Sequence, residues 1–560
     1  MNEPPPVAPA TTADALAVTI AGYGVRHVFG LMGDGNMHLF TALSQHGVQV
    51  VEVRHESAAV AMAEGYGWTS DAIGFCSVTH GPGLTHTATS LVVAARNHSP
   101  LVLLLAETPE GYEGAQHFDQ ELFVRACEAP YRRLRADDDP VSVLAERVAL
   151  ATDLSRPVVL AVPADLFTSA PGTTPAPPGT RSVRRPVEED DRVAARELAR
   201  ALSRAERPVL IAGRGTLTGD TATLMTRLAE RHGAALATTV PAKGMFDQHP
   251  YNLGISGGLS HRRAEEVLRA ADLVVAVGSS LDRGTTSSMR LFRDATVVQV
   301  VDEEAGGPVH PNVRRLFGDA ERVLSGCLAA PGPVPVAGHW FEPVPPPAKC
   351  WEEDLTDFDP PIEAGTVDPR RALAVISEAL PGDAVVVVGN GHCSGFATTF
   401  VQVPAVGRFF AAHGFGSIGQ ALPSAVGAAL GSPGHKVVVF EGDAAFMMHL
   451  QEVETAARVG ADVTAFVLND QALGTEYQRL LAEGADAELA AVSTPDLAAA
   501  AGALGARGRV IADASAVDAC ARDALAPGLA VVEVRVARSV LSRHMRRLRR
   551  AVAVPGSSMD

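Results

Sequence analysis

Two apolar runs end in acidic residues: Lys436-Val-Val-Val-Phe440 leads into Gly442-Asp443-Ala444, and Val463-Thr-Ala-Phe-Val-Leu468 leads into Asn469-Asp470. Short runs of this kind predict buried strands of a parallel sheet. Open α/β sheets bind ligands outside the carboxyl ends of their strands, so we expect both acids at such an edge. Carboxylate oxygens suit Mg²⁺ or Ca²⁺, and the backbone amides after Gly442 suit a phosphate. The two runs therefore predict a site for a metal ion and a diphosphate, and hence an enzyme.

Length and composition describe a globular chain of several units. The chain has 560 residues, of which 47% are hydrophobic and 20% are charged, as in soluble multidomain proteins. The formal net charge of -17 argues against non-specific binding to nucleic acid. No apolar stretch reaches the length of a membrane span. The six cysteines lie far apart without a Cys-x-x-Cys pair, which favours reduced thiols and a cytoplasmic location.

Strand-like runs alternate with helical stretches in three parts of the chain. This pattern predicts an α/β fold of three domains, each a mostly parallel sheet flanked by helices. The N-terminus has no charged leader and is expected to be disordered, and the basic tail is expected to be a solvated, frayed helix. The predicted boundaries are 1–10 (disordered N-terminus), 11–170 (first domain), 171–190 (linker), 191–330 (central domain), 331–366 (Pro-rich linker), 367–540 (third domain) and 541–560 (basic tail).

A third acidic residue of interest lies far upstream. Arg54-His55-Glu56 follows the strand-like run 48–53 and opens a predicted helix over 57–67. Alone, Glu56 is interpreted as a solvated acid at a helix start, which the helix dipole favours. Together with the two motifs above, it resembles the motif set of thiamine-diphosphate (ThDP) enzymes of the acetolactate synthase and pyruvate decarboxylase family. In that family a glutamate bonded to the aminopyrimidine ring activates the cofactor, and the resemblance gives this role to Glu56.

The resemblance also assigns the metal and diphosphate contacts. It implies that Asp443, Asp470 and the backbone carbonyl of Ala472 bind Mg²⁺ or another divalent cation, and that Gly442, Ala444 and Ala445 lie against the cofactor. Two residues depart from the family pattern, since Ala444 stands where Gly is usual and Asp470 where Asn is usual. Alanine is tolerable unless the backbone needs a positive φ. A divalent cation can accept the added negative charge.

Three further motifs resemble cofactor contacts of the family: His80-Gly-Pro-Gly-Leu-Thr-His86, Asn390-Gly-His392 and Gly414-Phe-Gly-Ser-Ile-Gly419. The resemblance places Pro82 in the cofactor loop and His392 against the diphosphate, although Gly391 replaces the usual Gln. It gives the carbonyl of Gly416 a bond to the aminopyrimidine, and Ile418 the role of a wedge between the two cofactor rings. The alternatives are that His392 is structural and that Ile418 is ordinary core.

Catalytic candidates on the substrate side come from both halves of the chain. Asp34 and Glu476 resemble catalytic acids of pyruvate decarboxylases, whereas Gln116 resembles a residue of the synthases. Asp34, His117 and Glu476 would form a proton-relay cluster with pKa values shifted by burial and mutual charge, and His80 would also enter the pocket. The alternatives are that Asp34 caps a helix, that Glu476 faces solvent and that His80 only shapes its loop.

These signals conflict on the reaction type, because Gln116 and the His80 loop favour synthases whereas Asp34 and Glu476 favour decarboxylases. We interpret the chain as a ThDP- and Mg²⁺-dependent enzyme that decarboxylates a 2-oxo acid and transfers the resulting acyl carbanion to an acceptor carbonyl, as acetolactate synthases do. The first alternative is a non-oxidative 2-oxo acid decarboxylase that releases an aldehyde. The remote alternative is a catalytically inactive partner protein with the ThDP fold.

The resemblance covers essentially the whole chain and implies two ThDP-binding domains with a Rossmann-like central domain. It also implies a homodimer or homotetramer with the cofactor between subunits; neither nucleic acid nor a membrane is expected as a partner. Family tails can fold over the active site, which is the alternative to the solvated, frayed helix expected for the basic tail. In the central domain, Gly213-Arg-Gly215 and Gly278-Ser-Ser280 would either hold FAD or be turns of a sheet without a nucleotide site. We favour turns, because a few glycines are weak evidence.

Overall fold

A computed structural model describes residues 10–112, 114–175, 188–302, 312–330, 338–345, 352–403, 405–412 and 414–552. Several predicted segments lie outside the described residues: 1–9 of the predicted disordered N-terminus (1–10), parts of both predicted linkers (176–187, 331–337 and 346–351) and the end of the basic tail (553–560).

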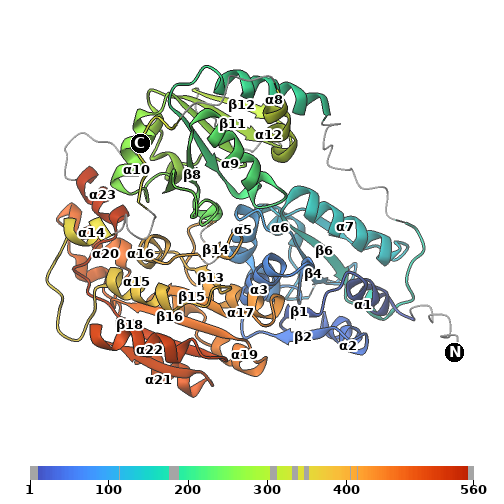
Figure 1. The fold of residues 1–560 in the computed structure, drawn as a ribbon. Helices are drawn as coiled ribbons and strands as arrows, with labels where there is room; N and C mark the ends of the chain where they lie inside the picture. Colours follow the sequence, from blue (N-terminus) through green and yellow to red (C-terminus); the bar gives the residue numbers. More distant parts are fainter. Residues whose placement is uncertain are drawn as a thin grey trace, which may run out of the picture.

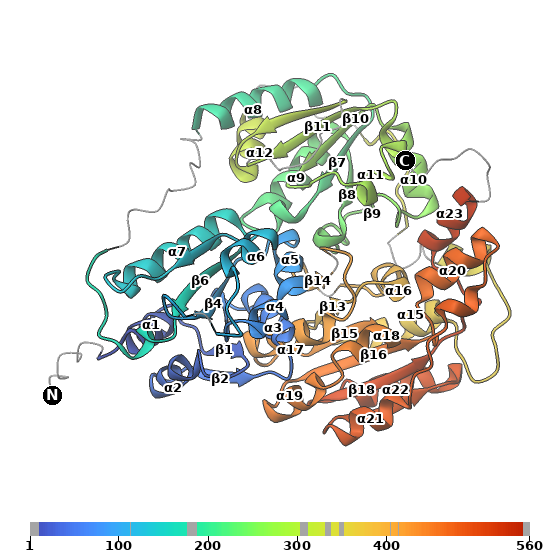
Figure 2. The ribbon, with the colours of Figure 1, turned by 180° about the vertical axis from the view of Figure 1, so that it is seen from behind.

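Within the described ranges, three six-stranded sheets follow one another along the chain, and every strand pair in them is parallel. Helices cover both faces of each sheet, and the three units form a triangle (Figures 1 and 2). The predicted fold class is therefore confirmed. The first unit has strands in the order β2-β1-β3-β4-β6-β5, the second β12-β11-β10-β7-β8-β9 and the third β14-β13-β15-β16-β18-β17.

The elements of the first unit are β1 (His27–Gly30), β2 (Gln49–Glu52), β3 (Gly74–Val78), β4 (Leu101–Glu107), β5 (Tyr131–Arg133) and β6 (Pro157–Pro163), with α1 (Thr12–Gly22), α2 (Met37–Gln45), α3 (Glu56–Thr69), α4 (Pro82–Thr85), α5 (Ala88–Arg96), α6 (Gln120–Ala126) and α7 (Pro140–Leu154). Those of the second unit are β7 (Pro208–Ala212), β8 (Ala235–Thr238), β9 (Asn252–Ile255), β10 (Leu273–Val277), β11 (Thr296–Val301) and β12 (Val313–Phe317), with α8 (Glu188–Leu202), α9 (Thr221–His232), α10 (Arg262–Ala270), α11 (Arg283–Thr286) and α12 (Ala320–Ala329).

The third unit contains β13 (Val385–Val388), β14 (Phe409–Ala411), β15 (Val437–Gly442), β16 (Val463–Asn469), β17 (Arg507–Ile511) and β18 (Ala530–Arg535). Its helices are α15 (Pro369–Ala379), α16 (His392–Phe400), α17 (Ala421–Gly431), α18 (Asp443–Met448), α19 (Glu452–Arg458), α20 (Gly474–Glu483), α21 (Leu497–Ala503) and α22 (Val517–Ala524). α14 (Glu352–Asp357) precedes this unit and α23 (Arg543–Val552) follows it.

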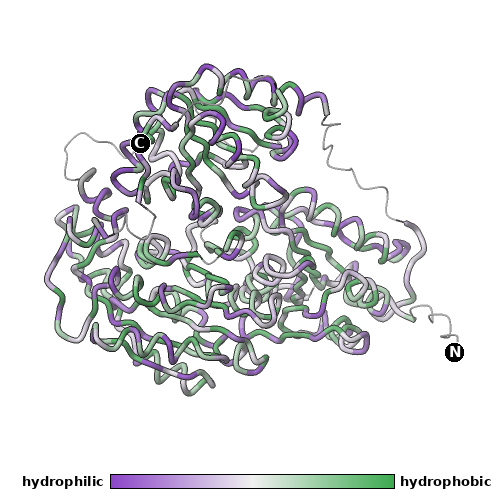
Figure 3. Tube along the Cα trace, in the orientation of Figure 1, coloured by the Kyte–Doolittle hydropathy of each residue, from purple (hydrophilic) through white to green (hydrophobic). Residues whose placement is uncertain are grey.

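The inner strands are mainly apolar, as expected for parallel strands covered on both faces. Every residue of β3, β4 and β6 is buried, and hydrophobic segments concentrate inside the units (Figure 3). The edge strand β17 reads Arg507-Gly-Arg-Val-Ile511 and buries only Ile511. Such a polar, half-exposed strand gives no apolar run to detect, which is why the sequence did not predict it.

Helices α3 and α17 join the first and third units into one core. They lie side by side in the middle of the molecule (Figures 1 and 2), and residues of both units belong to one continuous cluster. A Cβ on Gly65 would overlap the carbonyl oxygen of Ser424, and a Cβ on Gly427 would overlap that of Met62. The two backbones therefore touch, and any side chain at either glycine would separate the units.

Glycines of the central unit also have a packing role. The N–H of Gly215 donates to the carbonyl oxygen of Gly278 at 3.0 Å, and a Cβ on Gly213 would overlap the same oxygen. Contact between the two turns thus accounts for these glycines without a nucleotide. The same turns also line a cavity, through Gly215, Gly278 and Ser279, so the turn interpretation stays a prediction.

The start of the basic tail is docked, contrary to the expected solvated helix. α23 lies between α10 of the central unit and α20 of the third unit (Figures 1 and 2). Arg543 and Arg546 both bind Asp354, whose side chain is 1% exposed. Arg547 donates to the carbonyl oxygen of Ser260 at 2.9 Å. The sequence predicted a solvent-exposed helix because the partners of these arginines lie far away in the sequence.

Other expectations from composition can be compared with the described residues. Within them, no helix is both long and apolar enough to cross a membrane. Cys76, Cys127, Cys327, Cys393 and Cys520 are free thiols, as the expectation of reduced cysteines requires, and Cys350 lies outside the described residues.

The Asp354→Asn substitution is predicted to release α23. It leaves two guanidinium groups beside a neutral amide in a buried site, which weakens docking by about 3 kcal/mol. Hydrogen–deuterium exchange over 543–552 is the measurement. The control is Asp357→Asn on the same helix, because Asp357 is 42% exposed and its pair with Arg262 spans 3.8 Å, a contact with less than about 1 kcal/mol of effect. Equal protection of α23 in both variants would contradict the prediction.

Candidate active site

Asp443 and Asp470 meet at the carboxyl edge of the third sheet, as the strand pattern predicted. β15 and β16 are parallel neighbours, with Gly442 paired to Leu468. Asp443 is 2% exposed and begins α18, and its Oδ2 is buried without a hydrogen-bond partner among the described residues. An unpaired carboxylate oxygen in such a place is costly. A divalent cation at this edge would supply the missing partner.

The electrostatics of the pair also favour a cation. Burial, followed by the charge of Asp470, raises the pKa of Asp443 to about 7. Burial raises the pKa of Asp470 to about 6. Both carboxyl groups therefore resist ionisation in the folded chain, because two negative charges share a poorly solvated site. A bound cation would remove that cost.

The turn after Asp470 is strained and held in place by Arg538. Gln471 has a φ of 52°, and the N–H of Ala472 donates to Oδ1 of Asp470 at 3.1 Å. Arg538 donates from Nε to the carbonyl oxygen of Asp470 at 2.7 Å and from Nη2 to that of Gln471 at 3.0 Å. Its guanidinium carbon lies 5.0 Å from the ring centroid of Tyr477. Arg538 thus fixes the turn that carries two of the predicted metal ligands.

Ala444 is the second residue of α18 and does not have a positive φ. The alanine that replaces the usual glycine of the motif is therefore an ordinary helical residue here, and the condition set for tolerating it is met.

His392 is the first residue of α16 and is buried. Burial, followed by His544 and Arg549, lowers the pKa of His392 to about 3, so the ring is neutral at physiological pH. Its Nε2 accepts the backbone N–H of Ser542 at 3.2 Å. In a neutral imidazole the other nitrogen then carries the proton, so Nδ1 of His392 is a hydrogen-bond donor, as a phosphate ligand must be.

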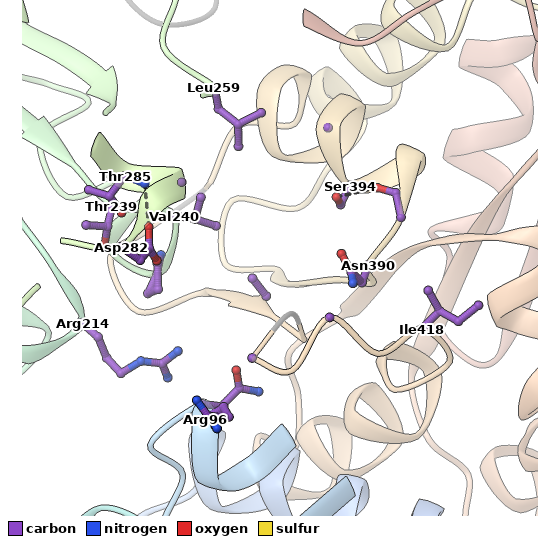
Figure 4. Close-up of a pocket in the computed structure, with 18 of the residues that line it drawn as sticks. Arg96, Arg214, Thr239, Val240, Leu259, Asp282, Thr285, Asn390, Ser394 and Ile418 are labelled. Carbon is purple, nitrogen blue, oxygen red and sulfur yellow. Dashed lines mark hydrogen bonds between the residues drawn. The ribbon is translucent and has the colours of Figure 1, made fainter. Parts of the chain in front are cut away.

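One cavity of about 1950 Å³ runs from this sheet edge towards the first and central units. Figure 4 shows Ile418, Asn390 and Ser394 on its third-unit side, with Arg214 and Asp282 of the central unit across from them. Ile418 is only partly buried, which argues against the ordinary-core interpretation. The predicted residues that line this cavity are His392, Gly416, Ile418, Gly442, Asp443, Ala444, Ala445, Asp470, Ala472 and Glu476.

Glu56 does not line that cavity in the same chain. It begins α3, its side chain is 11% exposed, and its Oε2 lies 2.8 Å from Nδ1 of His86. The loop around Pro82 lies beside it, since a Cβ on Gly83 would be 3.7 Å from Oε1 of Glu56. The structure thus brings the metal and diphosphate candidates together and places Glu56, the candidate for the activating acid, outside that cavity.

The first-unit candidates for the substrate side gather on neighbouring loops. Nε2 of His80 lies 2.9 Å from Oε1 of Gln116, and the Thr79 hydroxyl lies 3.5 Å from Asp34. His117 is exposed, with Nδ1 at 3.2 Å from the hydroxyl of Thr108. Asp34 does not cap α2, because the residue at the cap position is Asn36. The helix-cap alternative for Asp34 is therefore wrong.

Glu476 lies apart from these loops. It sits in the first turn of α20, is exposed, and lines the cavity with Asp470. Within one chain the cavity therefore contains Glu476 but neither Asp34 nor His117, and the proposed proton-relay cluster is not assembled there.

Sequence reasoning missed several residues of the site. Arg538 is far in sequence from the turn that it holds, and His86 was part of a quoted motif without a role. Glu441 is 1% exposed, and its Oε2 has no partner among the described residues. Burial raises the pKa of Glu441 to about 7. Its signal in the sequence was a charge within an otherwise apolar strand.

Three sequence models of one enzyme family match the chain. They are described as "Thiamine pyrophosphate enzyme", with the N-terminal TPP binding domain matching residues 10–127, the central domain 195–326 and the C-terminal TPP binding domain 389–534. The chain belongs to this family of ThDP enzymes. Its architecture and the sheet-edge acids agree with that membership.

Relatives in the family carry different names. "Acetolactate synthase" of Mycobacterium bovis is 28% identical over 493 residues, which cover 84% of this chain and 77% of the relative. "Acetolactate synthase large subunit" of Corynebacterium glutamicum is 27% identical over 489 residues, 85% of this chain and 77% of the relative. "Probable 2-ketoarginine decarboxylase AruI" of Pseudomonas aeruginosa is 30% identical over 487 residues, 83% of each chain.

The residues present fit the cofactor of the family. Asp443 offers a buried oxygen without a partner, Asp470 lies beside it, and His392 offers a donor for a diphosphate oxygen. These three groups have the chemistry required to hold a divalent cation and a diphosphate.

The Asp443→Asn substitution is predicted to stabilise the metal-free protein. The folded pKa of Asp443 is about 7, above its ordinary value of 3.8, so folding favours the protonated carboxyl. Stability is therefore lost as pH rises from about 4 to about 7, and the asparagine variant avoids this loss. At pH 7.5 we expect it to be more stable by roughly 1–3 kcal/mol in chelator.

Denaturant titrations at pH 5 and pH 7.5 measure this gain, which should shrink at the lower pH. The control is Asp518→Asn, an exposed side chain at 2.9 Å from Arg522, for which less than about 0.5 kcal/mol is expected. A destabilised Asp443→Asn protein at pH 7.5 would contradict the prediction.

Proposed function

We propose that this protein is a ThDP- and Mg²⁺-dependent enzyme that decarboxylates a 2-oxo acid and transfers the remaining acyl unit to an acceptor carbonyl. The observation that carries the proposal is the pair of buried carboxyl groups at adjacent strand ends, one with an unpaired oxygen, within a chain of the ThDP family. The acetolactate synthases among its relatives support ligation as the outcome.

The residues of the chain divide the work between binding and activation. Asp443, Asp470 and the carbonyl of Ala472 would bind the cation, and His392 would donate to the diphosphate. Gly442, Ala444 and Ala445 would present backbone to it. When bound, ThDP supplies the carbon nucleophile that attacks the 2-oxo acid. Glu56 would exchange a proton with the aminopyrimidine ring, with Gly416 and Ile418 orienting that ring.

We infer that the enzyme is a homodimer or a larger homo-oligomer, with the site completed by a second copy. Glu56 lies outside the cavity of its own chain, so one chain does not present both halves to one cofactor. Loops and helices near the site candidates also expose large apolar side chains. In the first unit these are Met32 (55% exposed), Met37 (41%) and Leu122 (65%), and in the third unit Phe415 (54%), Met448 (51%) and Leu489 (81%). Contact between such patches would bury them.

Simple decarboxylation to an aldehyde is the second candidate reaction. Glu476 lines the cavity near Asp470 and Asp34 is an exposed acid outside any helix cap, so both are available as proton donors. The relative named as a 2-ketoarginine decarboxylase supports this alternative.

A substrate panel separates the two reactions. Purified protein with ThDP and Mg²⁺ is incubated with 2-oxo acids that include pyruvate and 2-ketoarginine, and CO₂ release and products are followed by mass spectrometry. Acetolactate or acetoin from pyruvate supports ligation, whereas an aldehyde as sole product supports decarboxylation. Failure to release CO₂ from any 2-oxo acid, with ThDP bound, would contradict both.

The Glu56→Gln substitution is predicted to lower turnover by at least about a hundredfold, because it removes the acid–base group of the activation step. The affinity for ThDP, measured by calorimetry with Mg²⁺, should change less than about tenfold, since the glutamine retains a hydrogen bond. Glu52→Gln is the matched control, because Glu52 is exposed on the preceding strand. Wild-type turnover in the Glu56→Gln enzyme would contradict the proposal that Glu56 exchanges a proton with the aminopyrimidine ring.

The Arg538→Lys substitution is predicted to weaken Mg²⁺ binding in the presence of ThDP by about tenfold. Lysine keeps the charge but cannot reach two carbonyl groups with one planar fork, so the strained turn loosens. Magnesium titrations of cofactor binding provide the measurement. Arg535→Lys is the control, because Arg535 is 45% exposed and pairs with Glu533. Equal magnesium affinity in the two variants would show that Arg538 does not hold the turn.

A further inference from the structure

Glu56 has a partner to which the proposed reaction assigns no role. Nδ1 of His86 lies 2.8 Å from Oε2 of Glu56, and the two side chains differ in exposure, with 11% for Glu56 and 51% for His86. His86 follows α4 directly, and its backbone N–H donates to the carbonyl oxygen of Pro82 at 3.1 Å. The pair therefore joins a buried carboxyl group to a ring that reaches solvent.

The contact distinguishes the two oxygens of Glu56. A carboxylate only accepts hydrogen bonds, so Nδ1 of His86 carries the proton in this contact. Oε1 receives no hydrogen bond from a described residue, and it faces Gly83, which has no side chain to cover it. His86 thus anchors one oxygen and leaves the other available to a ligand.

The ring of His86 is itself fixed by its neighbours. It stacks on the ring of His55, with centroids 4.8 Å apart and planes 24° apart. His55 accepts the backbone N–H of Ser57 at Nδ1, at 3.2 Å. The hydroxyl of Ser57 lies 2.9 Å from Nε2 of His449, a buried residue of the third unit. The backbone N–H of Arg54, next to His55 in the chain, donates to Oε1 of Glu452 at 2.9 Å, and the Arg54 guanidinium pairs with Glu454 at 2.9 Å.

A metal ion is a poorer interpretation of the same groups. The ligand atoms of His55, Glu56 and His86 lie within 4.8 Å of one another. However, nearly parallel stacked rings direct their in-plane lone pairs side by side, whereas ligands of one ion must converge. Convergence of these rings on one cation would require breaking the stack. The observed geometry is that of a held hydrogen bond.

We propose that His86 is the positioning residue of Glu56. Its Nδ1–H holds Oε2, so that Oε1 is the oxygen that exchanges a proton with the aminopyrimidine of ThDP, and this charge-assisted bond stabilises the carboxylate that remains when the proton leaves. The inference rests on the proposed function, because it assigns a second residue to the activation step of Glu56.

The first test measures activation without substrate turnover. In holoenzyme with ThDP and Mg²⁺, the rate of hydrogen–deuterium exchange at the thiazolium C2 is compared among wild type, His86→Leu, His86→Asn and Glu56→Gln. His86→Leu removes the donor and should slow exchange by about tenfold to a hundredfold, with ThDP affinity within about threefold of wild type. His86→Asn keeps a donor and should recover to within about threefold of wild type. His46→Asn, remote in the first unit, is the matched control.

A double variant and a cofactor-free measurement complete the design. His86→Leu combined with Glu56→Gln should exchange no more slowly than Glu56→Gln alone, because one residue acts through the other. In the cofactor-free protein labelled with ¹⁵N-histidine, the ring signal of His86, assigned by its loss in His86→Asn, should show a protonated Nδ1 that shifts in Glu56→Gln. This NMR measurement tests the hydrogen bond from His86 to Glu56 even if the His86→Leu protein fails to fold.

Wild-type exchange in His86→Leu beside slow exchange in Glu56→Gln would overturn the role of His86 and leave the proposed function standing. His86→Asn as slow as His86→Leu, or an Nδ1 without a proton, would overturn it equally. Wild-type exchange in Glu56→Gln would overturn both the proposed function and this inference.

Discussion

The backbone contact between α3 and α17 is the constraint on which the rest of the structure depends. It is possible only because Gly65 and Gly427 lack side chains where the two helices touch. The contact fuses the cores of the first and third units, so the position of Glu56 at the start of α3 is fixed relative to the third sheet. The hydrogen bond between the Ser57 hydroxyl and Nε2 of His449 then aligns the Glu56 end of the helix. Packing of apolar surface thereby orients a polar site.

The two halves of the site are built on different physical principles. At the third sheet, parallel strand ends bring Asp443 and Asp470 together. Because both carboxyl groups are buried, their negative charges are unfavourable unless a cation binds between them. At the first unit, Glu56 has its charge met within the protein by His86. One half is therefore incomplete without a ligand, whereas the other is held ready by its own residues. This difference is consistent with a cofactor that is anchored through its diphosphate and activated through its ring.

Features that depend on neighbouring residues in the chain were predictable from the sequence. The strand runs before Asp443 and Asp470 and the helix after His55 are local patterns, and the structure has each of them. Contacts between distant segments were not predictable. No local pattern links Arg538 to the carbonyl oxygen of Asp470, or Asp354 to the arginines of α23. The tail was misjudged for this reason, since a run of arginines indicates solvent unless its acceptors are known. Within one chain Glu56 also does not line the cavity that contains Asp443 and Asp470, and no local pattern indicates this separation.

The hydrogen bond from Ser542 to His392 has an evolutionary consequence. Its donor is a main-chain N–H, which every amino acid except proline possesses. Substitutions at position 542 therefore leave the tautomer of the His392 ring unchanged, as long as the backbone conformation after β18 is kept. Because the donor belongs to the main chain, the side chain at position 542 can vary without changing which nitrogen of His392 carries the proton. Proline is the one residue that would remove this hydrogen bond.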